Sequence, residues 1–108
     1  MPKEGEIVRE IKAYLQSEGF FVWKNHGNQY SLAGLPDLMA VKGGLLWAIE
    51  VKQPGEEEKG LTEIQAHRLE QLKESGAVTM VASSVDTVRG VVEMTQGGEL
   101  LLQRLDQD

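Results

Sequence analysis

Three residues with catalytic chemistry lie on either side of a short turn. Asp37 precedes one apolar run, Glu50 and Lys52 end another, and Gly43-Gly44 separates the two runs. A glycine pair in this position predicts a β-hairpin with a two-residue turn. Counting outward from that turn places Asp37 opposite Glu50, with Cβ atoms about 5 Å apart. Lys52 projects from the same face as Glu50, because side chains alternate along a strand.

This carboxylate pair predicts a divalent-metal site. Two like charges placed opposite each other in an apolar sheet are destabilising unless a cation joins them. Mg²⁺ and Mn²⁺ prefer carboxylate oxygens, and a neighbouring lysine can orient a water or neutralise a phosphate. An isolated Glu-x-Lys is usually a solvated strand face, and an isolated Pro-Asp is usually a turn. Their combination on an otherwise apolar strand from Leu45 to Val51 favours a site that hydrolyses phosphodiesters.

The same residues resemble a known nuclease signature. Pro36-Asp37, followed by Glu50-Val51-Lys52, is similar to the motif of the PD-(D/E)xK nucleases. Gly34 to Asp37, Ile49 to Lys52, and Gln65 on the next helix resemble the virus-type replication-repair nuclease (VRR-NUC) family. The resemblance spans roughly residues 4 to 90. It implies a metal-dependent nuclease similar to small Holliday-junction resolvases, with Asp37 and Glu50 as metal ligands and Lys52 as the catalytic lysine.

The function expected first is that of an endodeoxyribonuclease that requires Mg²⁺ or Mn²⁺ and selects branched DNA such as Holliday junctions. Asp37, Glu50 and the carbonyl of Val51 would hold the metal, and a water oriented by Lys52 or the metal would attack the phosphate in line. The alternative is a non-catalytic DNA-binding or assembly module with the same fold, against which the intact Asp, Glu and Lys argue. A sequence-specific restriction-type enzyme is less favoured, because 108 residues leave no separate recognition region.

Helix and strand patterns surround the hairpin. A helix is expected over residues 5–18, ended by Gly19, because apolar residues recur at helical spacing. These are Ile7, Val8, Ile11, Tyr14 and Leu15. Residues 20–23 are expected to form a strand, and a second helix begins at Thr62, where Thr62 and Gln65 fit a capping box. That helix is expected to end at Gly76, and a buried strand is expected over residues 77–82. A third helix is expected from Ser83 or Ser84 to about Met94, followed by a turn at Gly97-Gly98. The pattern leaves open the type of the element over residues 99–105.

This order predicts one α/β domain over residues 1–108. It matches the αβββαβ core of the PD-(D/E)xK, or restriction-endonuclease-like, fold, which is a mixed central sheet flanked by helices. The order of the strands within the sheet does not follow from the pattern.

The first helix offers three acids that could join the metal site: Glu4, Glu6 and Glu10. Glu4 lies within about 20° of the centre of the apolar stripe near Ile11, so it is the acid expected to reach over the sheet. Glu6 points away, and Glu10 lies on the flank. An acid in the first helical turn also has a purely structural explanation, since it stabilises the helix dipole.

Several polar residues have two interpretations. Gln65 is explained by the capping box, and it also matches a family glutamine near the active site. His26 is expected to be a solvated loop residue. A set of residues before the hairpin could contact the phosphate backbone or a base: Lys24, Asn25, Tyr30 and Ser31.

Other apolar residues are assigned to packing. Trp23 and Trp47 are expected in the core, whereas Val88, Val91 and Val92 could belong either to the core or to a subunit interface. Cutting a four-way junction takes two matched cuts, so the presumed substrate suggests a homodimer with one site in each subunit.

Charge and composition restrict the partners. The net charge of −6 is unusual for a DNA-binding protein, but residues 1–52 carry six basic and six acidic groups, whereas residues 53–108 carry five and eleven. Binding to DNA is therefore expected to depend on metal and on low salt. The chain has no cysteine, no apolar signal region and no stretch of membrane-spanning length. A cytoplasmic protein of a bacterium or phage-infected cell is expected, without membrane partners.

Overall fold

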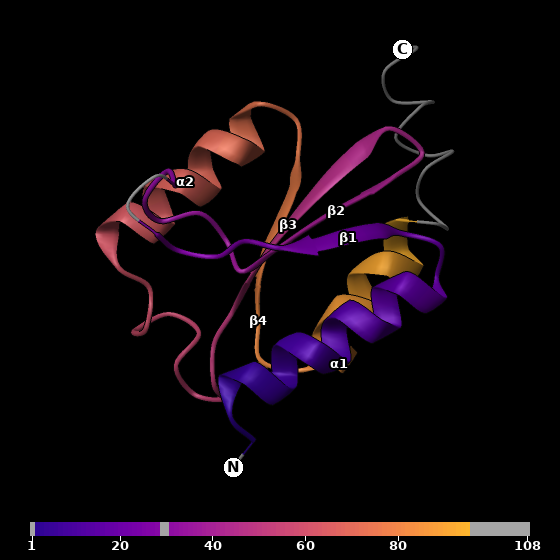
Figure 1. Cartoon of the computed structure of the whole chain (residues 1–108), viewed down its shortest axis with the longest axis horizontal. Coiled ribbons are helices and arrows are strands. Elements are labelled where there is room, and N and C mark those ends of the chain that lie inside the picture. The colour runs from indigo at the N-terminus through magenta and orange to yellow at the C-terminus, as the bar shows by residue number, and fades with distance from the viewer. Residues whose placement is uncertain (1, 29–30, 96–108) are drawn as a thin grey trace.

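The structure is a computed structural model that describes residues 2–28 and 31–95. Its elements are α1 (Glu4–Ser17), β1 (Phe21–Lys24), β2 (Leu38–Lys42), β3 (Leu45–Val51), α2 (Glu63–Glu74) and β4 (Val78–Ala82) (Figure 1). A third helix covers residues 85–95. The predicted order of elements is confirmed for these residues. Tyr30, the Gly97-Gly98 turn and the element predicted over residues 99–105 lie outside the described part.

The four strands form one mixed sheet in the order β1-β2-β3-β4. The β1–β2 and β2–β3 pairs are antiparallel, and β4 runs parallel to β3. In the hairpin Lys42 pairs with Leu45 and Leu38 pairs with Ile49, which confirms the predicted register. Gly43 and Gly44 have φ angles of +61° and +80°, the left-handed backbone that a tight two-residue turn requires.

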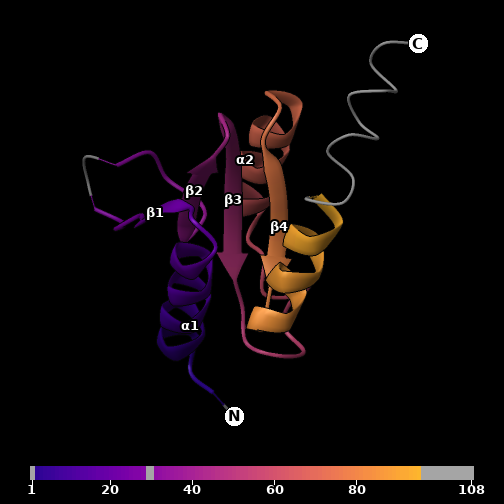
Figure 2. The ribbon, with the colours of Figure 1, turned by 90° about the vertical axis from the view of Figure 1, so that its right-hand side faces the viewer.

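One face of the sheet is covered by α1 and the third helix. In Figure 2 the third helix lies toward the viewer and α2 behind the strands. The predicted stripe of α1 is buried, with Tyr14 partly so, and the guanidinium of Arg89 lies 5.1 Å from the Tyr14 ring, which joins the two helices. Val88 and Val92 are buried in the same core, so they serve the core and not a subunit interface. The edge of Phe20 meets Trp47 there at 5.2 Å.

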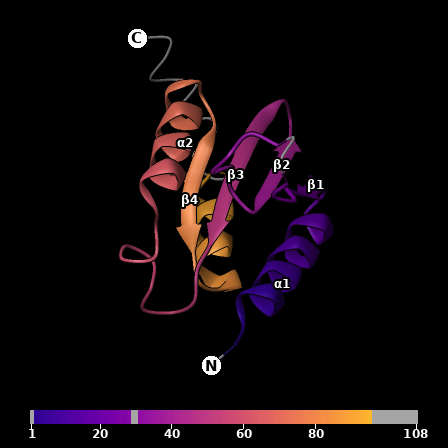
Figure 3. The ribbon, with the colours of Figure 1, turned by 60° about the vertical axis from the view of Figure 1, so that its left-hand side comes forward.

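The second helix lies on the other face, against β4 (Figure 3). Both bonds of the predicted capping box are present at Thr62 and Gln65, and Gly76 has a φ of +102° just beyond the helix end. None of the residues of α2 is buried. Among residues 2–28 and 31–95, no helix combines the length and apolarity needed to cross a bilayer.

Two predictions about packing are wrong. Trp23 is 37% exposed instead of lying in the core. It is on the α2 side of the sheet, but α2 packs on β4 at the opposite edge, so the ring stays partly in solvent. Most of β4 is half-buried and only Ala82 is fully buried, because β4 is the other edge strand.

The first helix and strand also differ slightly from their predicted bounds. Ser17 is the last helical residue, and β1 begins at Phe21 instead of residue 20. Gly19 reverses the chain with a φ of +88°, and the backbone N–H of Phe20 donates to the carbonyl of Leu15. Phe20 therefore belongs to the cap of α1, as glycine-ended helices commonly show.

Candidate active site

Asp37 and Glu50 lie together at the end of the hairpin away from its turn. Asp37 directly precedes β2, and Glu50 is the penultimate residue of β3. Their side chains are hydrogen-bonded to each other. The Oδ2 atom of Asp37 also accepts a hydrogen bond of 2.8 Å from the backbone N–H of Val51. The carboxylate of Asp37 is thus fixed over the end of β3, in the position that the register predicts.

Glu50 is a buried acid with unused bonding capacity. It is 1% exposed, and its Oε2 atom has no hydrogen-bond partner among the described residues. The pKa of Glu50 is raised from 4.5 to about 8, mainly by burial and next by the hydrogen bond and charge of Asp37, while the charge of Lys52 lowers it. A hydrogen bond between two carboxyl groups requires one proton between them. An unpartnered buried oxygen is costly, which points to a function.

The donors present fit a hard divalent cation. Two carboxylates with a free buried oxygen are the ligand type that Mg²⁺ and Mn²⁺ take, with water, a carbonyl or substrate phosphate completing the shell. In the described part of the chain, no three His, Cys, Asp or Glu side chains are close enough to hold one ion. Glu4, Glu6 and Glu10 are exposed on α1, and the structure does not gather them with the Asp37–Glu50 pair. Metal binding by Glu4 or by the Val51 carbonyl stays a prediction.

Lys52 is positioned by the loop that follows β3. Its backbone N–H donates to the carbonyl of Ala82, which extends the β3–β4 pairing. In the loop, the N–H of Gly60 donates to the carbonyl of Glu56, and a Cβ at Gly60 would lie 3.2 Å from Cδ of Lys52. The loop therefore packs on the aliphatic stem of Lys52. Because the Lys52 charge lowers the pKa of Glu50, its ammonium lies within electrostatic reach of the acid pair.

A cleft of about 310 Å³ opens beside Asp37. Its walls are residues 25–28 and 31–35 of the loop between β1 and β2, together with Gln65 of α2. The Oε1 atom of Gln65 accepts from the N–H of Thr62, so one side chain serves the helix cap and also lines the cleft. Ser31 donates through Oγ to the carbonyl of His26, and His26 is exposed, as expected of a solvated loop residue.

Comparison with known proteins agrees with this geometry. The model of the archaeal Holliday junction resolvase (Hjc) family matches residues 2–97. The chain belongs to the Hjc family.

Solved structures place this Hjc-family chain near the VRR-NUC proteins. A VRR_NUC domain has a TM-score of 0.69 and 26% identity, over 86% of this chain and 97% of that one. Hjc of Archaeoglobus fulgidus, a Holliday junction resolvase from an archaeal hyperthermophile, has a TM-score of 0.54 and 27% identity, over 70% and 64%. A VRR_NUC domain protein at 22% identity, with a TM-score of 0.69 over 86% and 87%, shows the fold alone. Among curated proteins, none matches the chain. The predicted family and nuclease fold are confirmed.

Two contacts between the cleft loop and α2 were not foreseen from the sequence. Gly34 has a φ of +80°, and a Cβ there would lie 2.7 Å from Cγ1 of Ile64 and 2.9 Å from its backbone. The Nε of Arg68 donates to the carbonyl of Ala33 at 2.8 Å. These contacts hold the loop against the start of α2, which brings Gln65 and Asp37 to one cleft. The glycine of the Gly-Leu-Pro-Asp motif was the available signal, but its close neighbour was not predictable.

Asn25 has a role within this Hjc-family fold that differs from the predicted DNA contact. Its Nδ2 donates to the carbonyl of Pro36 at 2.7 Å, and its backbone N–H donates to the carbonyl of Asp37 at 2.9 Å. One residue therefore fixes two successive peptide groups around Asp37. Contact of Asn25 with DNA stays a prediction, as do the contacts of Lys24 and Ser31, which are both exposed, with Ser31 in the wall of the cleft.

Asn25→Ala is expected to weaken both Mn²⁺ binding and DNA cleavage by roughly 10- to 100-fold, the usual cost of removing a group that orients a metal ligand. The expected cause is loss of the Pro36 bond, which frees the peptide before Asp37. Calorimetric titration with Mn²⁺ and a cleavage assay measure the two effects. Ser17→Ala, which removes a comparable side-chain bond to the Tyr14 carbonyl far from the cleft, should change neither. Unchanged Mn²⁺ affinity in Asn25→Ala would contradict the assignment.

Proposed function

We propose that this Hjc-family chain is a divalent-metal-dependent endodeoxyribonuclease that cleaves branched DNA such as Holliday junctions. The observation that carries the proposal is the pairing of buried Glu50, which has an unpartnered oxygen, with half-buried Asp37 next to Lys52. A stable scaffold would gain little from burying one acid beside another, whereas a metal site needs the two close. Membership of a family of Holliday junction resolvases supports nuclease activity on DNA.

Each residue has a defined part in this proposal. Asp37 and Glu50, with the carbonyl of Val51, would bind Mg²⁺ or Mn²⁺. When bound, the cation supplies Lewis-acid stabilisation of the charge that develops on the phosphate. Lys52 would orient the attacking water and neutralise phosphate charge. Gln65 would offer an amide N–H to the DNA from the opposite wall of the cleft.

The proposal includes a homodimer. The chain holds one Asp37–Glu50 pair, and resolution of a four-way junction takes two symmetric cuts, which a two-fold pair of subunits provides. Sedimentation that finds only monomers, with and without junction DNA, would contradict the homodimer and leave the proposed nuclease activity unaffected. Activity in the cytoplasm of a bacterium or a phage-infected cell is likewise proposed.

A panel of DNA structures tests the function directly. Four-way, three-way, flapped and linear DNA of equal length would be incubated with the protein in Mn²⁺, in Mg²⁺ or in EDTA. We expect the branched forms to be cleaved in Mn²⁺ or Mg²⁺ and to remain intact in EDTA. Binding of branched DNA without cleavage under every metal condition would favour the non-catalytic module instead.

A further inference from the structure

Two aromatic side chains on β1 face the solvent. Phe21 is 72% exposed and Trp23 is 37% exposed. Their ring centroids lie 5.8 Å apart, with the planes tilted by 53°. Large aromatic rings that gather on a surface commonly mark an interaction site, because exposing them to water is unfavourable.

The two rings continue the sheet face that carries the acid pair. Trp23 pairs with Met39 in β2 and Lys24 with Leu38, and one residue further out the N–H of Asn25 donates to the carbonyl of Asp37. Because side chains alternate, Phe21, Trp23, Asp37 and Glu50 share one face. Trp23 lies two residues along the strand from the Asp37 level, or roughly 7 Å, and Phe21 lies roughly 14 Å from it. The aromatic pair therefore extends directly from the cleft.

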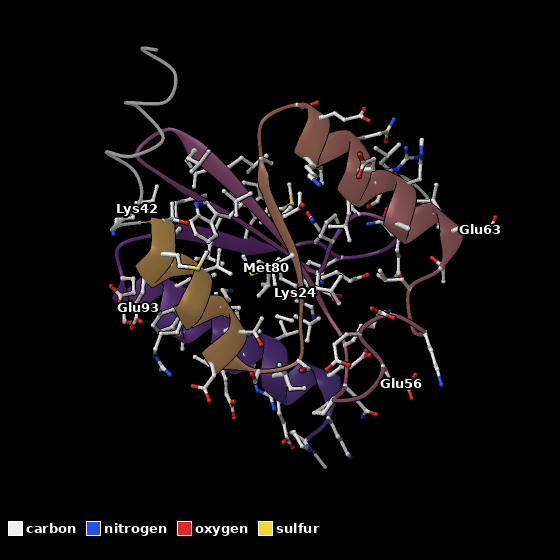
Figure 4. The ribbon with its side chains drawn as sticks, turned by 180° about the vertical axis from the view of Figure 1, so that it is seen from behind. Lys24, Lys42, Glu56, Glu63, Met80 and Glu93 are labelled. Atoms are coloured by element: carbon white, nitrogen blue, oxygen red, sulfur yellow. The ribbon has the colours of Figure 1, made fainter. Side chains whose placement is uncertain are left out.

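The chain around these rings is unusually poor in acids. Residues 19–36 contain no Asp or Glu, although the whole chain has a net charge of −6, and they include Lys24 and His26. Figure 4 shows Glu56 and Glu63 on the opposite side of the molecule from Lys42, which ends β2, whereas Glu93 lies on the same side as Lys42. A polyanion that approaches β1 and the loop after it therefore meets no acid from residues 19–36.

We propose that Phe21 and Trp23 form a stacking platform for unpaired bases of the DNA strand that enters the cleft. This inference rests on the proposed nuclease function and adds a preference, among branched DNAs, for those with unpaired nucleotides beside the cleavage site. Bases stack on aromatic rings regardless of sequence, so the platform recognises the absence of pairing and not a base order. A second copy of the chain is the less favoured occupant, because a protein seated at Trp23 would obstruct the cleft beside Asp37.

Leucine substitutions separate stacking from general apolar contact. Trp23→Leu combined with Phe21→Leu keeps apolar bulk but removes both π faces, whereas Trp23→Phe keeps a ring. Binding would be measured by anisotropy in Ca²⁺, to allow binding without cleavage, on a fork with two unpaired oligothymidylate arms and on a linear duplex of equal length. The double leucine variant should bind the fork roughly 5- to 100-fold more weakly and the duplex as the wild type does. Trp23→Phe should bind both DNAs nearly normally.

Two further readouts complete the test. Trp23 is exposed and Trp47 is 2% exposed, so the iodide-accessible fluorescence reports Trp23 and should be quenched by oligothymidylate. Met94→Ala removes an exposed side chain from the third helix and should affect no measurement. Phe21 is largely in solvent but Trp23 is only 37% exposed, so the unfolding temperature of each variant is measured to separate lost stability from lost stacking.

Four results would overturn the platform. They are wild-type affinity of the double leucine variant for the fork, an equal loss of affinity on fork and duplex, fluorescence unchanged by oligothymidylate, and conversion of a dimer to monomers with unchanged DNA affinity, which would identify the surface as a subunit interface. Any of these four results, obtained with a wild-type protein that cleaves forks, refutes the platform and leaves the nuclease proposal intact. A wild-type protein that neither binds nor cleaves branched DNA refutes the nuclease proposal as well.

Discussion

Glu50→Gln is expected to yield a folded protein whose DNA cleavage is reduced by about 1000-fold or more. The substitution keeps the shape of the side chain but removes the charge of one of the two carboxylates expected to bind metal, and the metal contributes several kcal/mol to such reactions. Cleavage of four-way DNA in Mn²⁺ would be measured under single-turnover conditions. Retention of wild-type activity would exclude Glu50 as a metal ligand.

The same substitution should stabilise the metal-free protein at high pH. The pKa of Glu50 is about 8 in the folded state and 4.5 ordinarily, so between these values the folded state holds a proton that the unfolded state releases. The stability that the folded state gains by keeping this proton on Glu50 is fully present below pH 4.5 and is lost as the pH rises through 8. Gln does not titrate, so well above pH 8 the variant should be more stable than the wild type by up to about 5 kcal/mol. Urea unfolding in EDTA at pH 5, 6.5 and 8.5 measures the difference, and equal pH slopes in the two proteins would contradict the raised pKa.

Two further variants, measured in the same DNA cleavage assay and by Mn²⁺ titration, test the roles of Asp37 and Lys52. Asp37→Ala should lose both Mn²⁺ binding and cleavage, whereas Lys52→Ala should lose cleavage and keep most of its Mn²⁺ affinity. Lys59→Ala, in the exposed part of the loop after β3, is the matched control and should cleave normally. Cleavage by Asp37→Ala at the wild-type rate would remove the proposed mechanism.

Gly34→Ala is expected to destabilise the protein by about 2–4 kcal/mol and to impair cleavage strongly. A non-glycine residue in left-handed backbone costs about 1–2 kcal/mol, and the added Cβ would also collide with the backbone of Ile64. Relief of that collision requires the cleft loop to move away from α2, which separates Gln65 from Asp37.

Gly44→Ala separates the two causes. Gly44 has the same φ of +80°, but no heavy atom lies within 4 Å of the position of its missing Cβ. This variant should therefore bear the conformational cost without the collision. Urea unfolding of both proteins gives the comparison, and equal losses of stability would show that the contact between Gly34 and Ile64 contributes nothing.

The hairpin and the acid pair could be predicted because they depend on local rules. A two-residue turn at Gly43-Gly44 determines the register, and the register alone places Asp37 opposite Glu50. The capping box at Thr62 is equally local. The exposure of Trp23 could not be predicted, since it depends on which strands form the edges and on where α2 packs. The bonds of Asn25 and Arg68 depend on the path of a loop that has no periodic pattern.

The absence of buried residues in α2 has a consequence for how the domain opens. The burial of apolar residues along α1 secures that helix to the sheet, whereas α2 is held by its half-exposed packing on β4, by the Arg68–Ala33 bond and by the close approach of Gly34. Partial unfolding that releases only α2 therefore costs less free energy than unfolding of the whole domain. Its amide protons would exchange with solvent through such local openings, while those of β3 would exchange only when the domain unfolds completely.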